Sequence, residues 1–243
     1  MPQASIPQRL AKRMAHVGLC SRRDAERWIE AGRVSVNGTL VTTPAFTVTD
    51  ADEIAVDGQL IAEKPEPRIW LYHKPVGVVT THKDPDGRLT VFDSLPKNMP
   101  RVISVGRLDL NSEGLLLLTN DGELARQLEL PSSGHTRTYR VRVRGAIDDK
   151  MLYAIRKGVT VEGVHYAPAE VTIEGGKGAN QWMVMTLTEG KNREIRRIFE
   201  HFGCQVSRLV RLSYGPYMLG DLERGQVKEV PVKKLPAKKS PQS

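Results

Sequence analysis

A single carboxylate, Asp109, stands in a polar turn between two short apolar runs of this 243-residue chain. The runs are Val102–Val105 and Leu115–Leu118, and their length and composition predict two buried strands. Strands on both sides hold a turn still, so the carboxylate of Asp109 can face a cleft and act on a bound molecule. Arg107, two residues earlier, adds a cation that can meet a phosphate. A loop aspartate more often only caps a turn, so this spacing alone leaves both interpretations open.

Three further segments carry residues that could take part in chemistry. The first, Thr136–Gly145, has a strand pattern that places Tyr139 with the apolar residues and a row of arginines on the opposite face. Core packing is the ordinary role of such a tyrosine, so the pattern alone does not make Tyr139 a site residue. The arginines face solvent or RNA.

The second segment, Asn192–Phe202, predicts a helix whose first turn carries several cations. Arg196 and Arg197 lie on either side of the apolar face of this helix. One guanidinium can therefore point toward the interior while the other stays in water. RNA docking without catalysis explains the same basic helix. The third segment, Cys204–Pro216, is a basic strand in which Leu209 belongs either to the core or to the wall of a pocket.

The charge balance predicts a polyanionic partner. The chain holds 36 lysines and arginines against 28 acidic residues, a formal net charge of +8. The excess is clustered, because residues 1–38 hold seven cations against three acids and residues 191–211 hold six against two. Residues 39–67 reverse the balance, with one lysine against six acids. Clusters of positive charge of this kind are typical of protein surfaces that bind RNA or DNA.

Metal and membrane chemistry have no signature in the sequence. Cys20 and Cys204 lack the paired spacing of zinc ligands, and the six histidines show no ligand motif. We therefore expect no metal, and isolated thiols suited to a reducing compartment. No apolar run is long enough to span a bilayer, and no apolar segment follows Met1. We expect a cytoplasmic protein without a membrane partner.

The first sixty residues predict two short helices followed by a hairpin. One helix is capped by Ser5 and ends at Gly18. The next begins at Ser21, where Asp24 completes a capping box. The dipeptide Asn37-Gly38 between alternating apolar residues marks the hairpin.

The segment Arg9–Leu40 resembles the RNA-binding domain named after ribosomal protein S4, whose helix pair presents a basic face to RNA. The resemblance implies that cations of this segment contact RNA phosphates, which position a protein without reading sequence. A solvated helix face is the alternative interpretation. The candidate residues are Arg9, Lys12, Arg13, Arg22, Arg23, Arg27 and Arg33.

A polar, proline-rich linker, Glu63–Pro67, marks a domain boundary. We predict an RNA-binding domain over residues 1–66 and a larger domain over residues 67–230. In the larger domain the predicted strands and helices mix without a βαβ period, which favours an α+β fold.

Two parts of the larger domain lead to more local expectations. A second strand is predicted at Val78-Val79, followed by a mobile polar loop at Thr81–Arg88. From Lys228 onward the chain becomes rich in lysine and proline. We expect residues 231–243 to form a basic, disordered tail.

Several ordered motifs resemble those of the pseudouridine synthases that modify ribosomal RNA. They span roughly residues 7–230 and follow the RNA-binding module expected in front of them. The motifs are Lys74-Pro75-x-Gly77, Gly106-Arg107-Leu108-Asp109 with Ser112–Gly122 after it, Thr138-Tyr139-Arg140-Val141, Glu189–Arg197 and Arg208-Leu209-Val210-Arg211. The resemblance implies a mixed, mainly antiparallel sheet and an isomerase that uses no cofactor.

The resemblance also implies a role for each candidate residue. The family detaches uracil from C1′ of the ribose, turns it and rejoins it through C5. Asp109 is then the essential carboxylate, either as a nucleophile or as a base that gives a glycal-like intermediate. Arg196 keeps Asp109 ionised by pairing with it, and Tyr139 stacks on the target base. Leu209 lines the pocket, and Arg107 fills the space that the base vacates.

Within the family, the resemblance is strongest to members that act on large-subunit (23S) ribosomal RNA. We therefore expect ribosomal RNA as the partner, free or in a pre-ribosomal particle, and a monomeric protein. The sequence leaves two alternatives open. One is the same chemistry on 16S ribosomal RNA or transfer RNA, and the other is a non-catalytic RNA-binding factor for ribosome assembly.

Overall fold

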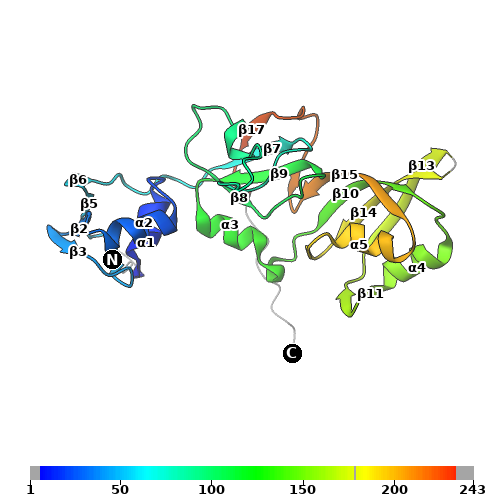
Figure 1. Ribbon diagram of the computed structural model, residues 1–243, viewed down its shortest axis with the longest axis horizontal. Helices are drawn as coiled ribbons and strands as arrows, with labels where there is room; N and C mark the ends of the chain where they lie inside the picture. Colours follow the sequence, from blue (N-terminus) through cyan, green and yellow to red (C-terminus); the bar gives the residue numbers. More distant parts are fainter. Residues whose placement is uncertain (1–5, 178, 234–243) are drawn as a thin grey trace. The chain divides into compact units, whose positions relative to one another are not determined.

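The computed structural model describes residues 6–177 and 179–233, and the chain divides into two units (Figure 1). The N-terminal unit contains the chain up to Pro67 together with residues 98–102 and 120–122. The C-terminal unit contains the other described residues. Each unit buries an apolar core of its own, as domains do.

Two helices and a small antiparallel sheet make up the N-terminal unit. Its elements are β1 (Gln8–Arg9), α1 (Leu10–His16), α2 (Arg22–Glu30), β2 (Val34–Val36), β3 (Thr39–Val41), β4 (Thr47–Val48), β5 (Ile54–Val56) and β6 (Gln59–Leu60). The sheet has the order β3-β2-β5-β6. The predicted capping box is present, since the Ser21 side chain accepts from the Asp24 N–H at 3.0 Å. Asn37 and Gly38 take positive φ angles of 50° and 79°, as a two-residue hairpin requires.

The first helix begins later than predicted. Its N-cap is Arg9, while Ser5, the predicted cap, lies outside the described residues. Gln8–Arg9 pairs instead with Thr47–Val48 as a two-residue strand. The Leu10 N–H donates to the Phe46 carbonyl at 2.9 Å, so a distant segment satisfies the backbone at the helix start.

Arg13, predicted to contact RNA, is buried with 9% of its surface exposed. His16 is also buried, so the buried side of α1 is wider than the sequence suggests. Arg13 lines a small hollow together with Asp50 and Asp52, and its Nε and Nη1 atoms have no hydrogen-bond partner in the described structure. Little of the Arg13 side chain is therefore available to RNA, and its contact with RNA stays a prediction.

A mixed sheet forms the framework of the C-terminal unit. Its strands are β7 (Ile69–Lys74), β8 (Ile103–Val105), β9 (Glu113–Thr119), β10 (Arg137–Arg144), β13 (Glu170–Lys177), β14 (Asn180–Leu187), β15 (Gln205–Tyr214), β16 (Tyr217–Met218) and β17 (Val227–Val230). In the described chain the main path is β13-β14-β10-β15-β9-β7-β17, with β8 beside β9 and β16 beside β15. Within that path β15 and β9 are parallel and the other pairs antiparallel. The predicted α+β class with a mixed, mainly antiparallel sheet is confirmed.

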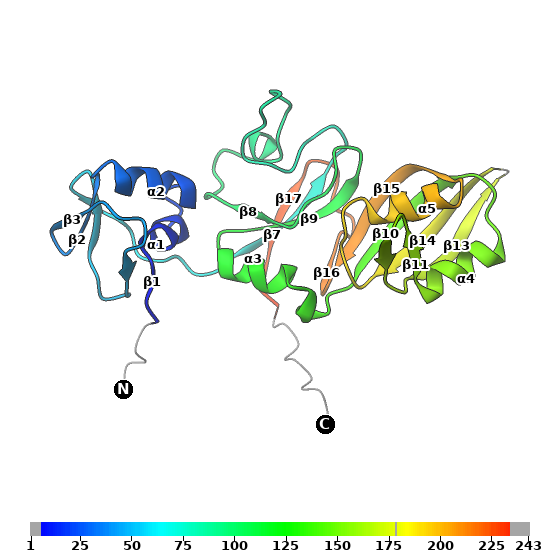
Figure 2. The same ribbon diagram turned by 60° about the horizontal axis from the view of Figure 1, so that its bottom comes forward.

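Helices cover parts of this sheet. They are α3 (Gly122–Glu129), α4 (Asp149–Lys157) and α5 (Glu194–His201), with short 3₁₀ turns at Phe92–Ser94 and Pro131–Ser133 and a separate hairpin of β11 (Val159–Val161) and β12 (Val164–Tyr166). Leu124 and Leu128 of α3 belong to one buried apolar cluster with Leu115 and Leu117 of β9. Figure 2 shows α3 beside the sheet. The β9 strand is buried on both faces, so the turn that precedes it has a fixed support.

Gly114 makes the parallel contact between β9 and β15 possible. A Cβ atom at Gly114 would lie 2.4 Å from the Arg211 carbonyl oxygen, and the φ angle of Gly114 is +105°. We expect Gly114→Ala to lower the free energy of unfolding by ~3 kcal/mol through overpacking and backbone strain, measured by urea unfolding. Gly134→Ala is the control, because Gly134 has a positive φ but open space around it. Equal losses for the two variants would contradict the steric argument.

Two local predictions in this unit are corrected. Val78-Val79 does not form a strand, and Val79 makes only an isolated bridge to Thr90. Lys228, where the tail composition begins, lies in β17 and pairs with Leu71 of β7. Lys233 donates from its backbone to the Tyr217 hydroxyl at 2.9 Å, so the start of the expected tail is anchored. The rest of that tail, 234–243, lies outside the described residues.

Candidate active site

A cleft of about 880 Å³ opens in the C-terminal unit. Its walls come from the turn between β8 and β9, the loop after β7, strands β10 and β15 and the segment that leads into α5. Four of the predicted site residues line it, namely Arg107, Asp109, Tyr139 and Leu209. The structure thus brings together side chains that are up to 102 positions apart in the sequence (from 107 to 209).

The turn that carries Asp109 is held by buried polar contacts. Lys74, which is fully buried, donates from Nζ to the main-chain oxygens of Asp109 and Ser112 at 3.1 and 2.9 Å. Thr80 Oγ1 donates to the Leu108 carbonyl at 2.9 Å. These bonds use the backbone of Asp109 and leave its half-buried carboxylate to the cleft.

Burial lowers the pKa of Lys74 from 10.5 to about 8, although the carboxylates of Asp109 and Glu113 oppose the shift. Such a shift corresponds to ~3 kcal/mol. The folded chain holds this proton less tightly than the unfolded chain does. The contribution of Lys74 to stability therefore rises as the pH rises from about 8 towards 10.5.

We expect the catalytic rate to fall as the pH rises above 8, whereas the contribution of Lys74 to stability rises. Loss of the Lys74 proton removes a positive charge beside the Asp109 turn, so the single-turnover rate should fall by up to about tenfold per pH unit above pH 8. The measurement is the rate of product formation with saturating enzyme between pH 6.5 and 9.0. A rate that stays level to pH 9.0 would remove Lys74 from the chemical step.

Arg196 does not pair directly with Asp109, which corrects the prediction. Its buried guanidinium donates to the main-chain oxygens of Asn111 at 2.8 Å and Val206 at 3.0 Å, and no ion pair joins it to Asp109 in the described chain. Burial lowers the pKa of Arg196, Arg193 lowers it further, and attraction to Asp109 acts to raise it. Arg196 therefore anchors the turn two residues after Asp109 and acts on the carboxylate through space.

Tyr139, Leu209 and Arg211 form one wall of the cleft. Tyr139 lies opposite Arg211 in the β10–β15 register, and the three side chains are 8%, 7% and 2% exposed. Arg211 Nε donates to the Leu115 carbonyl at 2.7 Å, while Nη2 has no partner in the described structure. The sequence reasoning missed Arg211, although its position two residues after Leu209 on the same strand face was a usable signal.

Cationic side chains are frequent around the cleft. Arg137 Nη2 donates to the Tyr214 hydroxyl at 2.8 Å, and its guanidinium lies 4.6 Å from the centre of that ring. Arg107 is exposed. The cations lining the cleft are Lys83, Arg88, Arg107, Arg137, Lys191, Arg193 and Arg211. Such a lining attracts a polyanion and raises its local concentration.

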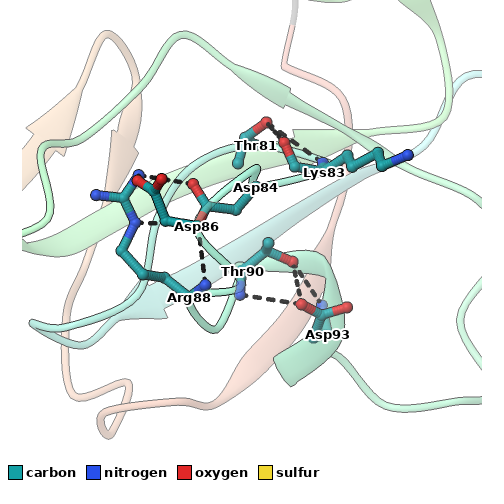
Figure 3. Close-up of polar contacts among 7 residues, drawn as sticks. All are labelled: Thr81, Lys83, Asp84, Asp86, Arg88, Thr90 and Asp93. Atoms are coloured by element: carbon teal, nitrogen blue, oxygen red, sulfur yellow. Dashed lines mark hydrogen bonds and ion pairs between the residues drawn. The ribbon is translucent and has the colours of Figure 1, made fainter.

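The loop after β7 forms another part of the wall, and it is braced internally (Figure 3). Asp84 accepts from the Arg88 backbone at 2.9 Å and from its guanidinium at 2.7 and 3.0 Å. Further along, Asp93 accepts from the backbone and hydroxyl of Thr90 at 3.0 and 2.7 Å. The structure confirms a polar loop at Thr81–Arg88 and shows hydrogen bonds within it, while its mobility stays a prediction.

Two carboxyl groups lie beside the entrance to α5. Glu194 lines the cleft and is 3% exposed, and one of its oxygens accepts from the Lys191 N–H at 2.9 Å. Burial, together with the nearby charge of Glu189, raises the pKa of Glu194 to about 7. Hydrogen bonds from Lys191 and Ala167 hold the pKa of Glu189 low despite its own burial. Glu194 is therefore able to gain or lose a proton near neutrality at the cleft wall.

Comparison with known proteins decides the family. Residues 68–201 match the family model for RNA pseudouridylate synthase, and residues 8–54 match the S4 domain. The chain belongs to the RNA pseudouridine synthase family. It is 50% identical to an uncharacterized RNA pseudouridine synthase of Rickettsia felis, over 92% of this chain and 96% of that protein.

Other members of the family are also similar along most of the chain. Ribosomal large subunit pseudouridine synthase B of Haemophilus influenzae is 46% identical over 92% of this chain and 64% of that protein. A crystal structure of a pseudouridylate synthase superposes with a TM-score of 0.66 at 27% identity, covering 92% and 96% of the two chains. The pseudouridine synthase is therefore an isomerase that acts on RNA, as the motifs predict. In the described residues, no helix combines the length and apolar character needed to cross a membrane.

The S4 domain of this pseudouridine synthase displays most of the predicted RNA-contacting cations. Five of them are exposed, namely Arg9, Arg22, Arg23, Arg27 and Arg33. Arg27 pairs with Asp24, and Arg33 pairs with Asp57 and lies 4.9 Å from the centre of the Trp28 ring. Lys12 is half-buried.

Proposed function

We propose that the enzyme converts a uridine of large-subunit ribosomal RNA to pseudouridine, with Asp109 as the reacting carboxylate. The observation that carries the proposal is the half-buried Asp109 at a cationic cleft that Tyr139 also lines. Relatives named ribosomal large subunit pseudouridine synthase B support the choice of RNA.

Asp109 begins the reaction in this proposal. It either attacks C1′ of the ribose or removes a ribose proton, and both routes need a negative carboxylate. Two buried cations, Lys74 and Arg196, interact electrostatically with Asp109 and hold the main chain around it. A charge presented by a fixed turn needs little reorganisation when the reaction starts.

The base then changes its point of attachment. The N1–C1′ bond breaks, uracil turns, and a C5–C1′ bond forms; the proton on C5 leaves and N1 takes up a proton. Tyr139 offers a ring face to the uracil, and stacking of this kind contributes about 1–3 kcal/mol per base. Leu209 supplies an apolar wall, and the exposed Arg107 occupies the space that the flipped base leaves. Flipping costs a few kcal/mol for a stacked base, which phosphate contacts offset.

The RNA target is tested by tritium release from three RNAs labelled with [5-³H]uridine. Transcripts of 23S ribosomal RNA, 16S ribosomal RNA and transfer RNA are incubated with the purified enzyme, and modified positions are then mapped. We expect release of one tritium per 23S molecule and background release from the others. Release mainly from 16S or transfer RNA would overturn the choice of RNA but keep the chemistry. Absence of release from all three would favour a non-catalytic RNA-binding factor.

The S4 domain is tested by removing two exposed cations of α2. We expect Arg22→Ala with Arg23→Ala to raise the Kd for 23S ribosomal RNA about tenfold, because two phosphate contacts are lost. The measurement is filter binding at 0.15 M salt. Glu26→Ala with Glu30→Ala, two exposed acids on the same helix, is the control and should not weaken binding. A normal Kd for the arginine variant would rule out this face of α2 as an RNA contact.

A further inference from the structure

One face of the sheet in the C-terminal unit has no role in the cleft. Along β10 the residues alternate between buried and exposed, and Val141 and Val143 are fully buried. Val171 of β13 and Met183 of β14 are also 0–1% exposed on this covered face. Helix α4 packs on β13 and α5 on β15, and both helices lie beside this part of the sheet in Figure 2. The cleft lies on the covered face too, because Tyr139 shares it. The opposite face, called the open face below, is exposed or half-buried along β10, β14 and β15.

The open face carries a row of arginines. Arg140, Arg142 and Arg144 follow one another at every second position of β10, about 6.7 Å apart at the usual rise of a strand. Such a spacing is comparable to that of successive phosphates along an RNA strand. Arg208 of β15 lies directly opposite Arg142. Four guanidinium groups therefore share one side of two adjacent strands.

An aromatic ring completes this surface. Trp182 of β14 is the other cross-strand neighbour of Arg142. The guanidinium carbons of Arg140 and Arg208 lie 4.6 and 5.8 Å from the centre of the Trp182 ring. A half-buried tryptophan among arginines on an exposed sheet resembles the stacking platforms on which other sheet proteins bind RNA.

The charges on the open face are only partly balanced. Arg140 pairs with Glu174, and Arg208 pairs with the buried Glu113. In the described chain, Arg142 and Arg144 make no ion pair. The exposed acids of this face, Glu170 and Glu174, both lie on the outer strand β13. The centre of the face is therefore positive.

The position of Arg142 is unfavourable for folding alone. Like charges directly opposite each other in a sheet are destabilising, and Arg142 faces Arg208 without an acid of its own. Residues that break a local rule without a compensating contact tend to serve a function. An RNA phosphate between the two strands would supply the missing negative charge.

We propose that the open face is a second RNA-binding surface, which holds the phosphate backbone of an RNA segment outside the cleft. The proposal goes beyond the choice of target uridine and rests only on RNA as the substrate. Arg142 and Arg144 make the phosphate contacts, and Trp182 with its two flanking arginines forms the floor on which an unpaired base rests. The enzyme thereby binds a structured RNA on both faces of one sheet.

The test compares two pairs of charge removals in the full chain. Arg142→Gln with Arg144→Gln removes the two unpaired cations of the open face. Lys150→Gln with Lys157→Gln removes two exposed cations of α4, which packs on the covered face. Binding of a 23S ribosomal RNA transcript is measured by filter binding between 0.05 and 0.3 M salt, and folding is checked by thermal unfolding.

We expect the arginine variant to bind the transcript about 3- to 10-fold more weakly at 0.15 M salt. Its slope of log K against log salt should be smaller by about 1.4, or 0.7 for each lost contact to a single strand. Equal affinity of the arginine variant and the parent, or an equal loss in the lysine variant, would overturn the proposal. One further result would overturn the proposal. In it, the parent and the lysine variant bind an acidic protein, the arginine variant does not, and the affinity of the arginine variant for RNA is unchanged.

A second measurement locates the contact and separates this proposal from the proposed target. The transcript is made with 4-thiouridine and crosslinked by light, and the attached peptides are identified. We expect crosslinks to the β10 and β14 peptides that carry Arg142 and Trp182, and their absence would contradict the proposal. If the transcript shows no pseudouridine after incubation with the parent, the choice of 23S RNA fails while the binding comparison still stands.

Discussion

Replacing Asp109 by asparagine should lower the single-turnover rate of pseudouridine formation by about 1,000-fold or more, as expected when the reacting group is removed. Asparagine keeps the size of the side chain but loses its charge and its ability to attack carbon or take a proton. The fold should survive, because the turn is held through the main-chain oxygen of Asp109, which Lys74 and Ser112 contact. The measurement is tritium release from [5-³H]uridine-labelled RNA with enzyme in excess.

The matched control for this variant is Asp93→Asn. Asp93 is also a loop aspartate, but it caps a turn by accepting from Thr90 and does not line the cleft (Figure 3). It represents the ordinary role that the sequence leaves open for Asp109. We expect Asp93→Asn to lower stability slightly, because it weakens the hydrogen bonds from Thr90, and to retain the rate. Equal tritium release from Asp109→Asn and the parent would show that Asp109 has no part in the chemistry.

The sequence predicts those parts of the fold that short-range patterns determine. Alternation along Arg137–Arg144 places Tyr139 on the buried face, and the structure confirms it. The capping box at Ser21 and the hairpin at Asn37 depend on residues within four positions of each other, and both are present. In each case the residues whose contacts determine the conformation are the same residues that form the sequence pattern.

The errors arise where a distant segment determines the outcome. Gln8–Arg9 is extended because it pairs with residues 38 to 40 positions later, at Thr47–Val48. Lys228 lies in a strand because β7 offers a free edge to it. Arg13 is buried, and it lines a hollow together with Ile54 and Leu60, which lie more than 40 positions later. No periodicity within these segments carries that information.

The same distinction applies to the candidate site. Motifs identify Asp109 and Arg196 correctly as neighbours, since attraction to Asp109 acts on the pKa of Arg196. They do not reveal that Asn111 and Val206 accept the hydrogen bonds of that guanidinium, which leaves no direct pairing. A buried guanidinium donates to those carbonyl groups nearby that have no other donor. Only the assembled fold determines which carbonyl groups these are.

Arg211 has unmet hydrogen-bonding capacity within the cleft wall. It is 2% exposed, Nε donates to Leu115, and Nη2 has no partner in the described chain. A buried donor without an acceptor costs about 1–3 kcal/mol. An oxygen of the bound uridine, held beside Tyr139, would satisfy this donor. We therefore expect Arg211 to gain in the complex a hydrogen bond that its Nη2 lacks in the described structure.

Arg211→Gln should accordingly lower kcat/KM by about 10- to 100-fold, the effect of one hydrogen bond to a charged group. We also expect Arg211→Lys to recover little of the loss, because the ammonium group cannot donate to Leu115 and to the substrate in the planar geometry of a guanidinium. The measurement is tritium release over a range of RNA concentrations, with thermal unfolding of each variant. A purely structural role would lower the midpoint of unfolding and leave kcat/KM of the folded fraction unchanged, and that result would exclude Arg211 from substrate recognition.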